Sequence, residues 1–498
     1  MHNTLICGLG QEKEIACGGY TQQLRWVDEK SSPKSKQTTV TVLLQTYSSP
    51  SCIKSININP YGFYLTDPQD RNLLEYHLHI LPQLIYLNKS RFASIQAMEF
   101  LNTVESNNLV YPTALASAAS HLFNQGCITK FEFFKKRQQA LRAVRAAVGT
   151  PKDEQAMSQV KARRLPTRCH DYTISASLRL AGVELIQGSD LQAIYPFIYG
   201  TAALVRERYA FAEEKGGINQ QEADLNSSLF VLTKRMLAYF DIMSSVPCAR
   251  RPFLEEKYWL VDIGHIEEQK NNDSGLDPVM GCFATIIGLT GESAALVSQY
   301  FEQLISAPAF HNSQKDILHR LASWVPLRPN NQAGVEAGQE YDMCVSAGKA
   351  HSLATQIFLL RSADFNQNSP QLRILFHALH AAITGVVISS APMTTMLWPL
   401  WVLACECYDS QSRDEIALPI LDQLFQRLAF RNVSTCIKVI QERIWTLSSS
   451  DVVVSRLNEA SALDETMEST LRIPLPGGWR QSEWVRYCWV NKIELILA

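Results

Sequence analysis

The sequence predicts an all-α protein, a large irregular helical array preceded by a mostly disordered N-terminal segment. Two observations predict the helices. From residue 70 onward, apolar residues recur at helical spacing in stretches of about 15 to 20 residues, and Gly, Pro or Asn residues separate these stretches. Other fold classes are not favoured. Strand-like alternation is nearly absent, which argues against a β-sheet protein, and no fixed repeat period supports a regular solenoid.

Composition and charge narrow the class of protein. The chain has 498 residues, of which 46% are apolar and 19% charged, so it can bury a large core. Its formal net charge of -2 provides no overall basic field of the kind that a stand-alone nucleic-acid binder carries. The 12 cysteines are scattered singly, which favours free thiols in a reducing compartment, the cytosol or the nucleus, over a disulfide framework.

The composition divides the chain into three parts. Residues 28–69 are rich in Ser, Thr, Pro and Lys, which is typical of a largely disordered linker. Residues 1–27 precede this linker as a separate module, and residues 70–498 are expected to form the all-α domain. The first helix of that domain is expected to begin at Asp70, whose carboxylate can cap a helix N-terminus.

Two helices are expected to follow in close succession. The first is rich in small residues and is expected to stop at Gly126. The second places Phe131, Phe134, Leu141 and Val144 near helical spacing, which predicts that these four residues form its buried face.

The remaining helices include the expected centre of the core. Residues 171–210 predict two helices that are split by the Gly-Ser-Asp sequence at 188–190. Segments 280–308 and 374–408 carry few charges and are expected to lie deepest. Residues 374–405 contain no Asp, Glu, Lys or Arg, but a Ser-Ser-Ala-Pro break favours a buried helix pair over a membrane span.

Sequence patterns of known catalytic sites are absent. The chain contains no G-x-S-x-G, no G-x-x-x-x-G-K-[ST], no H-E-x-x-H and no G-x-G-x-x-G after a strand. The stretch GLTGES at 288–293 lacks the lysine of a phosphate-binding loop and is expected to be a turn between two helices. The sequence therefore predicts that the protein is not an enzyme.

Three further groups of residues could bind a metal or a partner, but for each of them a purely structural role is favoured. His377 and His380 could share a helical face, but no further ligand lies within a turn, so packing is favoured over metal binding. Cys405 and Cys407 form a C-x-C pair that favours buried thiols over a redox or zinc site. The basic run at 160–168 favours a solvated loop, with a nuclear-import signal as the alternative.

The N-terminal stretch CGGYTQQLRW resembles the end of the six-cysteine binuclear zinc cluster of fungal transcription factors. The positions that carry this resemblance are Cys17, Gly19, Tyr20, Leu24 and Trp26.

The helical region resembles the regulatory domain that follows this cluster in one large branch of those factors. The resemblance runs from about residue 70 to the C-terminus and rests on motifs that contain mainly packing residues. Asp277 before Pro278, for example, looks like a helix N-cap with proline at the first helical position. The motifs are LVYPTALASAASHLFN (109–124), FKKRQQALRAV (134–144), LAYFDIMSSVPCARRPFL (237–254), GLDPVMGCFATIIGLTGESAAL (275–296), MLWPLWVLACECYDSQSR (396–413) and FRNVSTCIKVIQERIW (430–445).

The chain departs from that family at the zinc cluster. Six cysteines that hold zinc require paired C-x-x-C elements and a basic run between them, and this sequence contains no C-x-x-C. Cys17 is therefore predicted to be an orphaned zinc ligand, and residues 1–27 a remnant of the DNA-binding module. The chain as written is expected to hold no cofactor, although the resemblance implies zinc for an intact member. A missed upstream exon and a real loss of the module are the two explanations.

The resemblance implies a nuclear regulator of RNA polymerase II transcription, in a pathway of secondary metabolism or nutrient use, whose DNA-binding module is truncated in this chain. Expected partners are the transcription machinery or co-regulators, with DNA only if an upstream zinc cluster exists, and no membrane. The alternative is a helical protein-interaction or small-molecule-sensing protein that has lost DNA binding. A ligand pocket is then expected among residues 283–296 and 374–404.

Overall fold

The structure is a computed structural model and confirms the all-α class. Within the part of the chain that it describes, every regular element is helical, and the sole bridge of strand type joins Asp277 and Gly281. The described residues are 67–87, 104–149, 169–189, 191–214, 225, 227–259, 276–326, 335–447, 479–493 and 495–498. The predicted N-terminal module and linker, residues 1–66 above all, lie outside these ranges.

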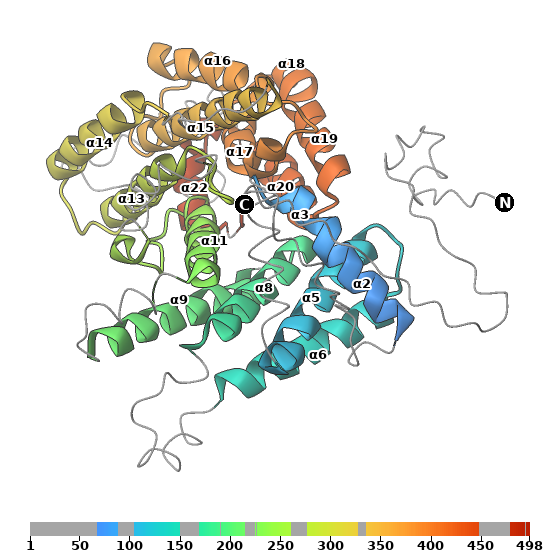
Figure 1. The fold of residues 1–498 in the computed structure, drawn as a ribbon. Helices are drawn as coiled ribbons and strands as arrows, with labels where there is room; N and C mark the ends of the chain where they lie inside the picture. The colour runs from blue at the N-terminus through green and yellow to red at the C-terminus, as the bar shows by residue number, and fades with distance from the viewer. Residues whose placement is uncertain are drawn as a thin grey trace, which may run out of the picture.

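The helices form two groups that meet along α8 and α11 (Figure 1). The first group is α2 (Pro68–His79), α3 (Leu81–Ile85), α5 (Val104–Asn124) and α6 (Lys130–Val148). The second group contains all the other described elements. They are α8 (Asp171–Gln187), α9 (Leu191–Glu214), α11 (Ser228–Ser245), η2 (Glu256–Tyr258), α13 (Ala284–Phe301), α14 (Ala307–Ala322), α15 (Val335–Arg361), α16 (Pro370–Thr384), η3 (Ala391–Thr395), α17 (Leu397–Cys405), α18 (Ser410–Ser412), η4 (Arg413–Ala417), α19 (Leu418–Leu428), α20 (Arg431–Val439), η5 (Ile440–Ile444), η6 (Gln481–Glu483) and α22 (Trp484–Val490).

The first group begins one turn earlier than the sequence predicts. The N-cap of α2 is Asp67, whose carboxylate accepts a hydrogen bond from the backbone N–H of Gln69, with Pro68 at the first helical position. Asp70 lies inside the first turn and forms an ion pair with the buried Lys136 of α6. The prediction that Asp70 is the cap was wrong because its carboxylate has a charged partner in another helix.

Helix α6 buries a different face from the one predicted. Phe133 and Lys136 are buried against α2 and α5, whereas Phe131 and Phe134 are 77% and 45% exposed. Of the predicted residues, only Val144 is buried. The Lys136 ion pair fixes the rotation of the helix, and a helix-period pattern with phenylalanines on neighbouring faces fits either rotation. The capping box formed by Thr129 and Glu132 sets where α6 begins.

Two helices end next to glycines at which the sequence predicted helix ends. Gly126 and Gly188 have φ angles of 73° and 62°, the left-handed conformation in which glycine ends a helix. The prediction that residues 171–210 split into two helices near residue 188 is confirmed by α8 and α9.

The turn predicted at GLTGES and the helix N-cap predicted at Asp277 were both wrong. Gly288 and Gly291 of the GLTGES stretch lie inside α13, where Gly291 allows close approach to Ile242 of α11. Asp277 accepts hydrogen bonds from the N–H groups of Val279 and Met280, so it stabilises a turn, and α13 starts only at residue 284. The GLTGES stretch fits either element, because a tightly packed helix uses the same small residues that a turn contains.

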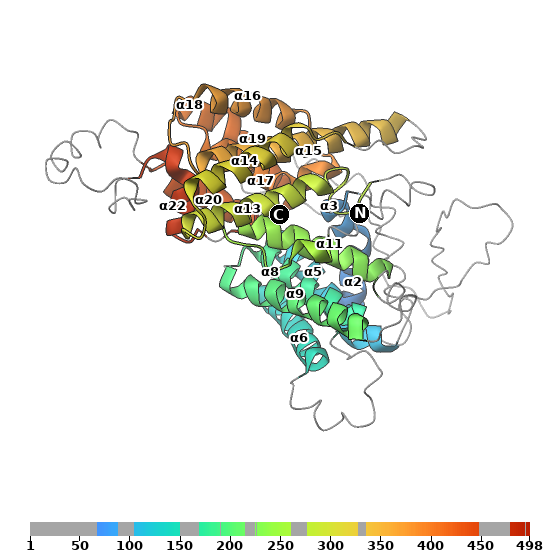
Figure 2. The ribbon, with the colours of Figure 1, turned by 90° about the vertical axis from the view of Figure 1, so that its left-hand side faces the viewer.

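In the second group, the main apolar cluster includes buried residues of α13, α15 and α17, whose places in the fold are shown in Figures 1 and 2. Every residue of α17 is buried, and Pro399 lies in its first turn. Helix α16 differs from the prediction because it buries only Leu372, Leu379 and Ile383. The predicted buried helix pair is therefore one buried helix, α17, and one amphipathic surface helix, α16.

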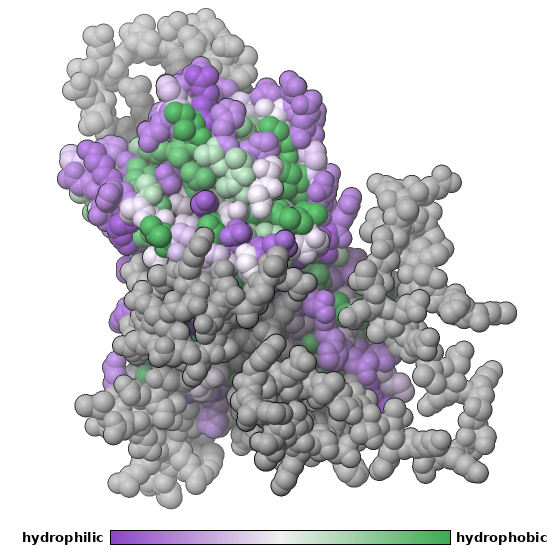
Figure 3. Space-filling model, turned by 45° about the horizontal axis from the view of Figure 1, so that its top comes forward, coloured by the Kyte–Doolittle hydropathy of each residue, from purple (hydrophilic) through white to green (hydrophobic). Residues whose placement is uncertain are grey.

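The side of the molecule around α14, α15 and α16 shows apolar patches between polar side chains (Figure 3). Ile374 of α16 and Val387 beyond its end are among the exposed large apolar residues. Among the described helices, none combines the length and the hydropathy needed to cross a lipid bilayer.

The C-terminal residues complete the core. Trp484 and Cys488 of α22 are buried, and the last residues run between α11 and α20, where the N–H of Leu497 donates to the carbonyl of Met243 at 3.2 Å. Asn432 of α20 donates to the carbonyl oxygens of Ile496 and Ala498 at 3.4 and 3.2 Å.

Candidate functional site

The predicted zinc ligand, Cys17, and the basic run at 160–168 lie outside the described residues. The two histidine positions in α16 differ in exposure, since His377 is exposed and His380 half-buried. Among the residues that the structure describes, no group of three or more His, Cys, Asp or Glu side chains is placed to hold a metal ion.

The C-x-C pair consists of two buried free thiols, as predicted. Burial raises the pKa of Cys407 to about 12, and it raises the pKa of Cys405 well above the ordinary value. A thiol with so high a pKa is neutral at physiological pH, and the thiolate is the reactive form of cysteine. These cysteines are therefore packing residues.

A cavity of about 90 Å³ lies where the two helix groups meet. Helices α2, α3, α5, α8 and α11 contribute its walls. Its apolar wall includes Leu81, Ile85, Leu178, Ile186, Leu232 and Phe240, and its polar wall consists of His77, Tyr86, Ser117, Ser175, Arg179 and Thr233. None of the residues that line this cavity belongs to segments 283–296 and 374–404, where a ligand pocket was predicted.

Arg179 is the single charged residue of the cavity lining, and no acidic residue belongs to it. Burial, and then the positive charge of Arg179, lower the pKa of His77 well below its ordinary value, so His77 is neutral at physiological pH. Arg179 Nη1 donates a hydrogen bond to Thr113 Oγ1 at 3.1 Å, which orients the guanidinium next to α5.

Gly182, which lies inside α8, also lines the cavity. A Cβ atom at Gly182 of α8 would have no atom within 4 Å. Sequence reasoning missed the cavity because its residues come from five helices. A glycine inside a helical pattern was the one available signal, since an isolated glycine there often has a packing or functional reason.

A network of buried charged and polar side chains lies at the C-terminal end of α17. Arg361 Nε and Nη2 donate to Glu406 Oε1 and Oε2 at 2.9 and 2.8 Å, and the two side chains are 1% and 3% exposed. Trp484 Nε1 donates to Glu406 Oε1 at 2.9 Å, and Tyr408 donates to Oε2 at 2.9 Å. The network ties α15, the end of α17 and α22 together.

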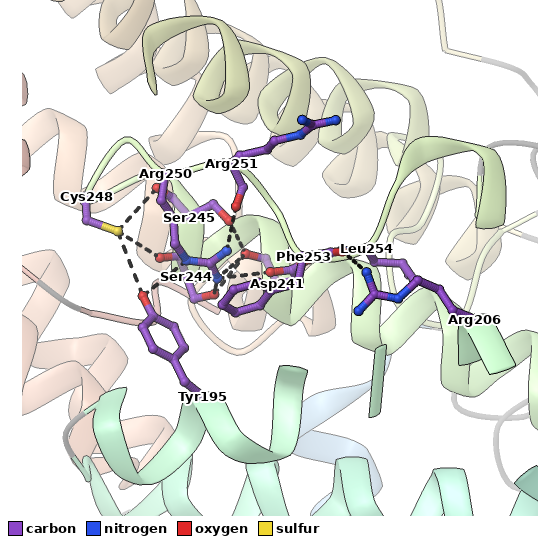
Figure 4. A network of polar contacts seen from close by, with 10 residues as sticks. All are labelled: Tyr195, Arg206, Asp241, Ser244, Ser245, Cys248, Arg250, Arg251, Phe253 and Leu254. Atoms are coloured by element: carbon purple, nitrogen blue, oxygen red, sulfur yellow. Dashed lines mark hydrogen bonds and ion pairs between the residues drawn. The ribbon is translucent and has the colours of Figure 1, made fainter. Parts of the chain in front are cut away.

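A second network lies at the end of α11 (Figure 4). Asp241, which is fully buried, accepts hydrogen bonds from Arg250 at 3.0 Å and from the N–H of Leu254 at 2.7 Å. Burial raises the pKa of the Asp241 carboxyl, and the Arg250 guanidinium opposes that shift. Arg250 also donates to Tyr195 of α9 at 3.2 Å and lies 4.0 Å from the ring centroid of Phe253. These contacts fix the loop after α11 on α9.

Both networks pair charged groups within the protein and leave no reacting group at a concave surface, so they are structural. Of the features described above, the cavity is the one with a concave surface.

The sequence was compared with models of protein families, with curated proteins and with solved structures. The model of the fungal-specific transcription factor domain matches residues 72–458. No curated protein and no solved structure matches the chain. Proteins with this domain are transcription regulators, which are nuclear in general and generally not enzymes. The match covers most of the chain, from within α2 to beyond η5, and the chain therefore belongs to the fungal-specific transcription factor domain family.

Proposed function

We propose that this chain regulates RNA polymerase II transcription in the nucleus through its helical domain, and that the domain acts on protein partners without specific DNA contacts of its own. The observation that carries the proposal is the family match over the helices. Pathways of secondary metabolism or nutrient use are the processes that we propose it controls.

The cysteine positions support the second part of the proposal. The sequence contains no C-x-x-C pair, which a six-cysteine zinc cluster requires. Cys405, Cys407, Cys436 and Cys488 are buried free thiols, and burial raises the pKa of each of them. We propose that Cys17 is a zinc-cluster position without its partners in this chain, so any zinc-dependent DNA recognition requires ligands from elsewhere.

A gel-shift assay and a zinc assay test the DNA-binding part. The purified 498-residue chain is expected to show no specific retention of C/G-rich duplexes at physiological salt, because non-specific phosphate contacts weaken with salt and no base-reading module is present. Its zinc content is expected to be substoichiometric. Specific retention of one duplex, or stoichiometric zinc that is lost in Cys17→Ser, would contradict the proposal.

A tethering assay tests the regulatory part. The chain is fused to an unrelated sequence-specific DNA-binding domain, and transcripts of a reporter with that domain's site are measured in fungal cells. We expect transcription to change relative to the DNA-binding domain alone, and we expect the change to disappear in Glu406→Gln, which disrupts the core. An unchanged reporter with a stably expressed fusion would overturn the regulatory role.

A further inference from the structure

We propose that the outward face of α6 binds an acidic peptide segment that also carries large apolar side chains. This inference rests on the proposed function, because it names the class of protein partner on which the helical domain acts.

The outward face lies on the side of α6 that points away from the molecule. Helix α6 packs mainly against α5 and α8, at the edge of the fold (Figures 1 and 2). At 100° per residue, its exposed residues fall within about a third of the helix circumference. The residues that form the outward face are Phe131, Phe134, Lys135, Gln138, Arg142 and Arg145.

Helix α6 exposes apolar rings and buries a cation. Phe131 and Phe134 are 77% and 45% exposed, whereas Lys136 is buried and pairs with Asp70. These two rings are the only phenylalanines among the exposed large apolar side chains of the described chain, and residues three apart on a helix are neighbours on its surface. A single exposed apolar side chain is ordinary, but neighbouring ones mark a surface that another molecule can cover.

The ring of Phe134 is held in position by other aromatic rings. Its centroid lies 5.0 Å from that of the buried Phe133, which stacks on Phe123 of α5 at 5.4 Å. The ammonium group of Lys130 lies 5.8 Å from the centroid of the Phe134 ring. Because this ring is already ordered, a partner that covers it loses little conformational entropy at this contact.

The cations of α6 fall into two classes. Lys136 and Arg137 form ion pairs with Asp70 and Glu184 of other helices. The remaining four cations are exposed, and none of them forms an ion pair with a residue that the structure describes. They are Lys130, Lys135, Arg142 and Arg145.

The single acidic residue of α6, Glu132, already has hydrogen-bond donors. Its carboxylate accepts hydrogen bonds from the backbone N–H of Thr129 at 2.8 Å and from the side chain of Gln69 at 2.7 Å. The outward face itself contains no carboxylate. It is therefore basic and partly apolar, although the whole chain has a formal net charge of -2.

Charge and apolar surface together select the partner. The exposed cations attract an acidic segment and orient it on the helix. A phosphate backbone would satisfy these charges equally well, but it would leave Phe131 and Phe134 without an apolar partner. An acidic peptide with Leu or Phe side chains covers both kinds of residue, and aromatic and Arg side chains are enriched in protein interfaces.

The binding test uses synthetic peptides with the purified full chain. A fluorescent peptide contains Asp, Leu and Phe in helical amphipathic order, and anisotropy measures its binding at physiological ionic strength. One control peptide has Asn for each Asp, and the other has Ser for each Leu and Phe. We expect the acidic amphipathic peptide to bind at least about tenfold more tightly than either control. Equal binding of either control, or no binding at all, would overturn the proposal.

Charge variants locate the site. Lys135→Glu combined with Arg142→Glu reverses two cations of the outward face, and we expect it to weaken peptide binding at least about tenfold. The control combines Lys315→Glu of α14 with Lys349→Glu of α15, which changes the net charge equally at exposed positions of other helices. An equal effect of the two double variants, or full binding by the α6 variant, would contradict the proposal.

An uncharged variant tests the apolar contribution. Phe131→Gln is expected to weaken peptide binding at least about threefold and to leave the thermal midpoint unchanged, because this side chain is mostly exposed. Ile374→Gln is the control, since Ile374 is 70% exposed on α16. Unchanged binding in Phe131→Gln, or a loss in Ile374→Gln, would exclude the outward face as the apolar contact.

Two further results separate this proposal from its alternatives. If nucleic acid were the partner, a random-sequence duplex at the same concentration would displace the peptide at physiological salt, and such displacement would overturn the proposal. The tethering assay is scored separately. A fusion that regulates the reporter while the chain binds no acidic peptide would overturn this inference alone, whereas a silent reporter with intact peptide binding would overturn the regulatory role alone.

Discussion

At the scale of single residues, this protein places ionisable groups in its interior and gives them specific partners. Arg361 and Glu406 form a bidentate pair that is nearly inaccessible to solvent. Such a pair need not add stability relative to apolar residues, but each charge depends on the other to offset its desolvation. His121 and His351 are fully buried as well. Burial lowers the pKa of both imidazoles, so these side chains are neutral at physiological pH.

The first prediction concerns the Arg361 pair. Glu406→Gln leaves the guanidinium buried without its counter-charge and turns an amide N–H₂ group toward donors from Arg361 or Trp484. We expect the free energy of unfolding to fall by about 3 to 5 kcal/mol in urea denaturation. The control is Glu292→Gln, which breaks the exposed pair with Arg320, whose side chains are 35% and 46% exposed, and should cost at most about 1 kcal/mol. Equal losses in the two variants would contradict the assigned burial.

The second prediction concerns pH. Burial lowers the pKa of His121 to about 4 and that of His351 to about 3, while hydrogen bonds to the carbonyls of Leu428 and Thr395 oppose the shifts. Because these values lie below the ordinary 6.5, the unfolded state takes up protons first as the pH falls. The stabilisation is therefore complete above about pH 6.5 and is lost as the pH decreases toward 4.

The measurement is urea denaturation at about pH 7 and pH 5. Each of the two histidines is expected to lower the free energy of unfolding by roughly 2 kcal/mol between these values. His121→Gln should reduce the pH-dependent loss by that amount, and His377→Gln, at an exposed position of α16, should leave it unchanged. A pH dependence that is the same in His121→Gln and the unmodified chain would show that His121 titrates normally.

At the scale of elements, helix ends are determined both by local chemistry and by what lies beyond them. Gly126 and Gly188 both end helices with positive φ angles. They differ in their surroundings, because Gly126 has open space where a Cβ would be, and Gly188 lies against the backbone of Arg431 at the start of α20. The same sequence signal therefore marks a free helix end in one case and a helix contact in the other.

The third prediction uses this pair. A Cβ at Gly188 would lie 2.7 Å from the carbonyl carbon of Arg431 and 2.8 Å from its oxygen. Gly188→Ala is expected to cost roughly 2 to 5 kcal/mol, since the left-handed conformation and the overlap with α20 both oppose it. Gly126→Ala carries the conformational cost alone, about 1 to 2 kcal/mol. Chemical denaturation of both variants compares them, and similar losses would argue against the contact between α8 and α20.

At the scale of the whole molecule, the core is closed by residues that follow the matched domain region. The family match ends at residue 458, yet Trp484 is fully buried next to Phe358 and donates to Glu406. Leu497 lies between α11 and α20. The helices of the matched region thus depend on the C-terminal residues for part of their packing.

The fourth prediction tests that dependence. Trp484→Ala removes a large buried ring and a hydrogen bond to Glu406, and we expect a loss of about 3 to 5 kcal/mol, with increased binding of a dye that reports exposed apolar surface. Trp489→Ala on the same helix is the control, because Trp489 is only half-buried and packs against Phe301. If Trp489→Ala were as damaging as Trp484→Ala, the assigned orientation of α22 would be wrong.

The sequence by itself determined the helical class, the split near Gly188, the helix end at Gly126 and the neutral thiols at Cys405 and Cys407. Each of these depends on local periodicity, on the backbone freedom of glycine or on spacing along the chain. Its motifs also indicated the family, since they are spread over the same helices that the family model matches.

Only the tertiary structure decided which side of a helix is buried and what lies next to it. The rotation of α6 depends on Asp70 of another helix, and the cavity depends on five helices that meet around Gly182. Such contacts join residues that are distant in the chain, and a periodic pattern constrains the faces of one helix without selecting the partner of each face.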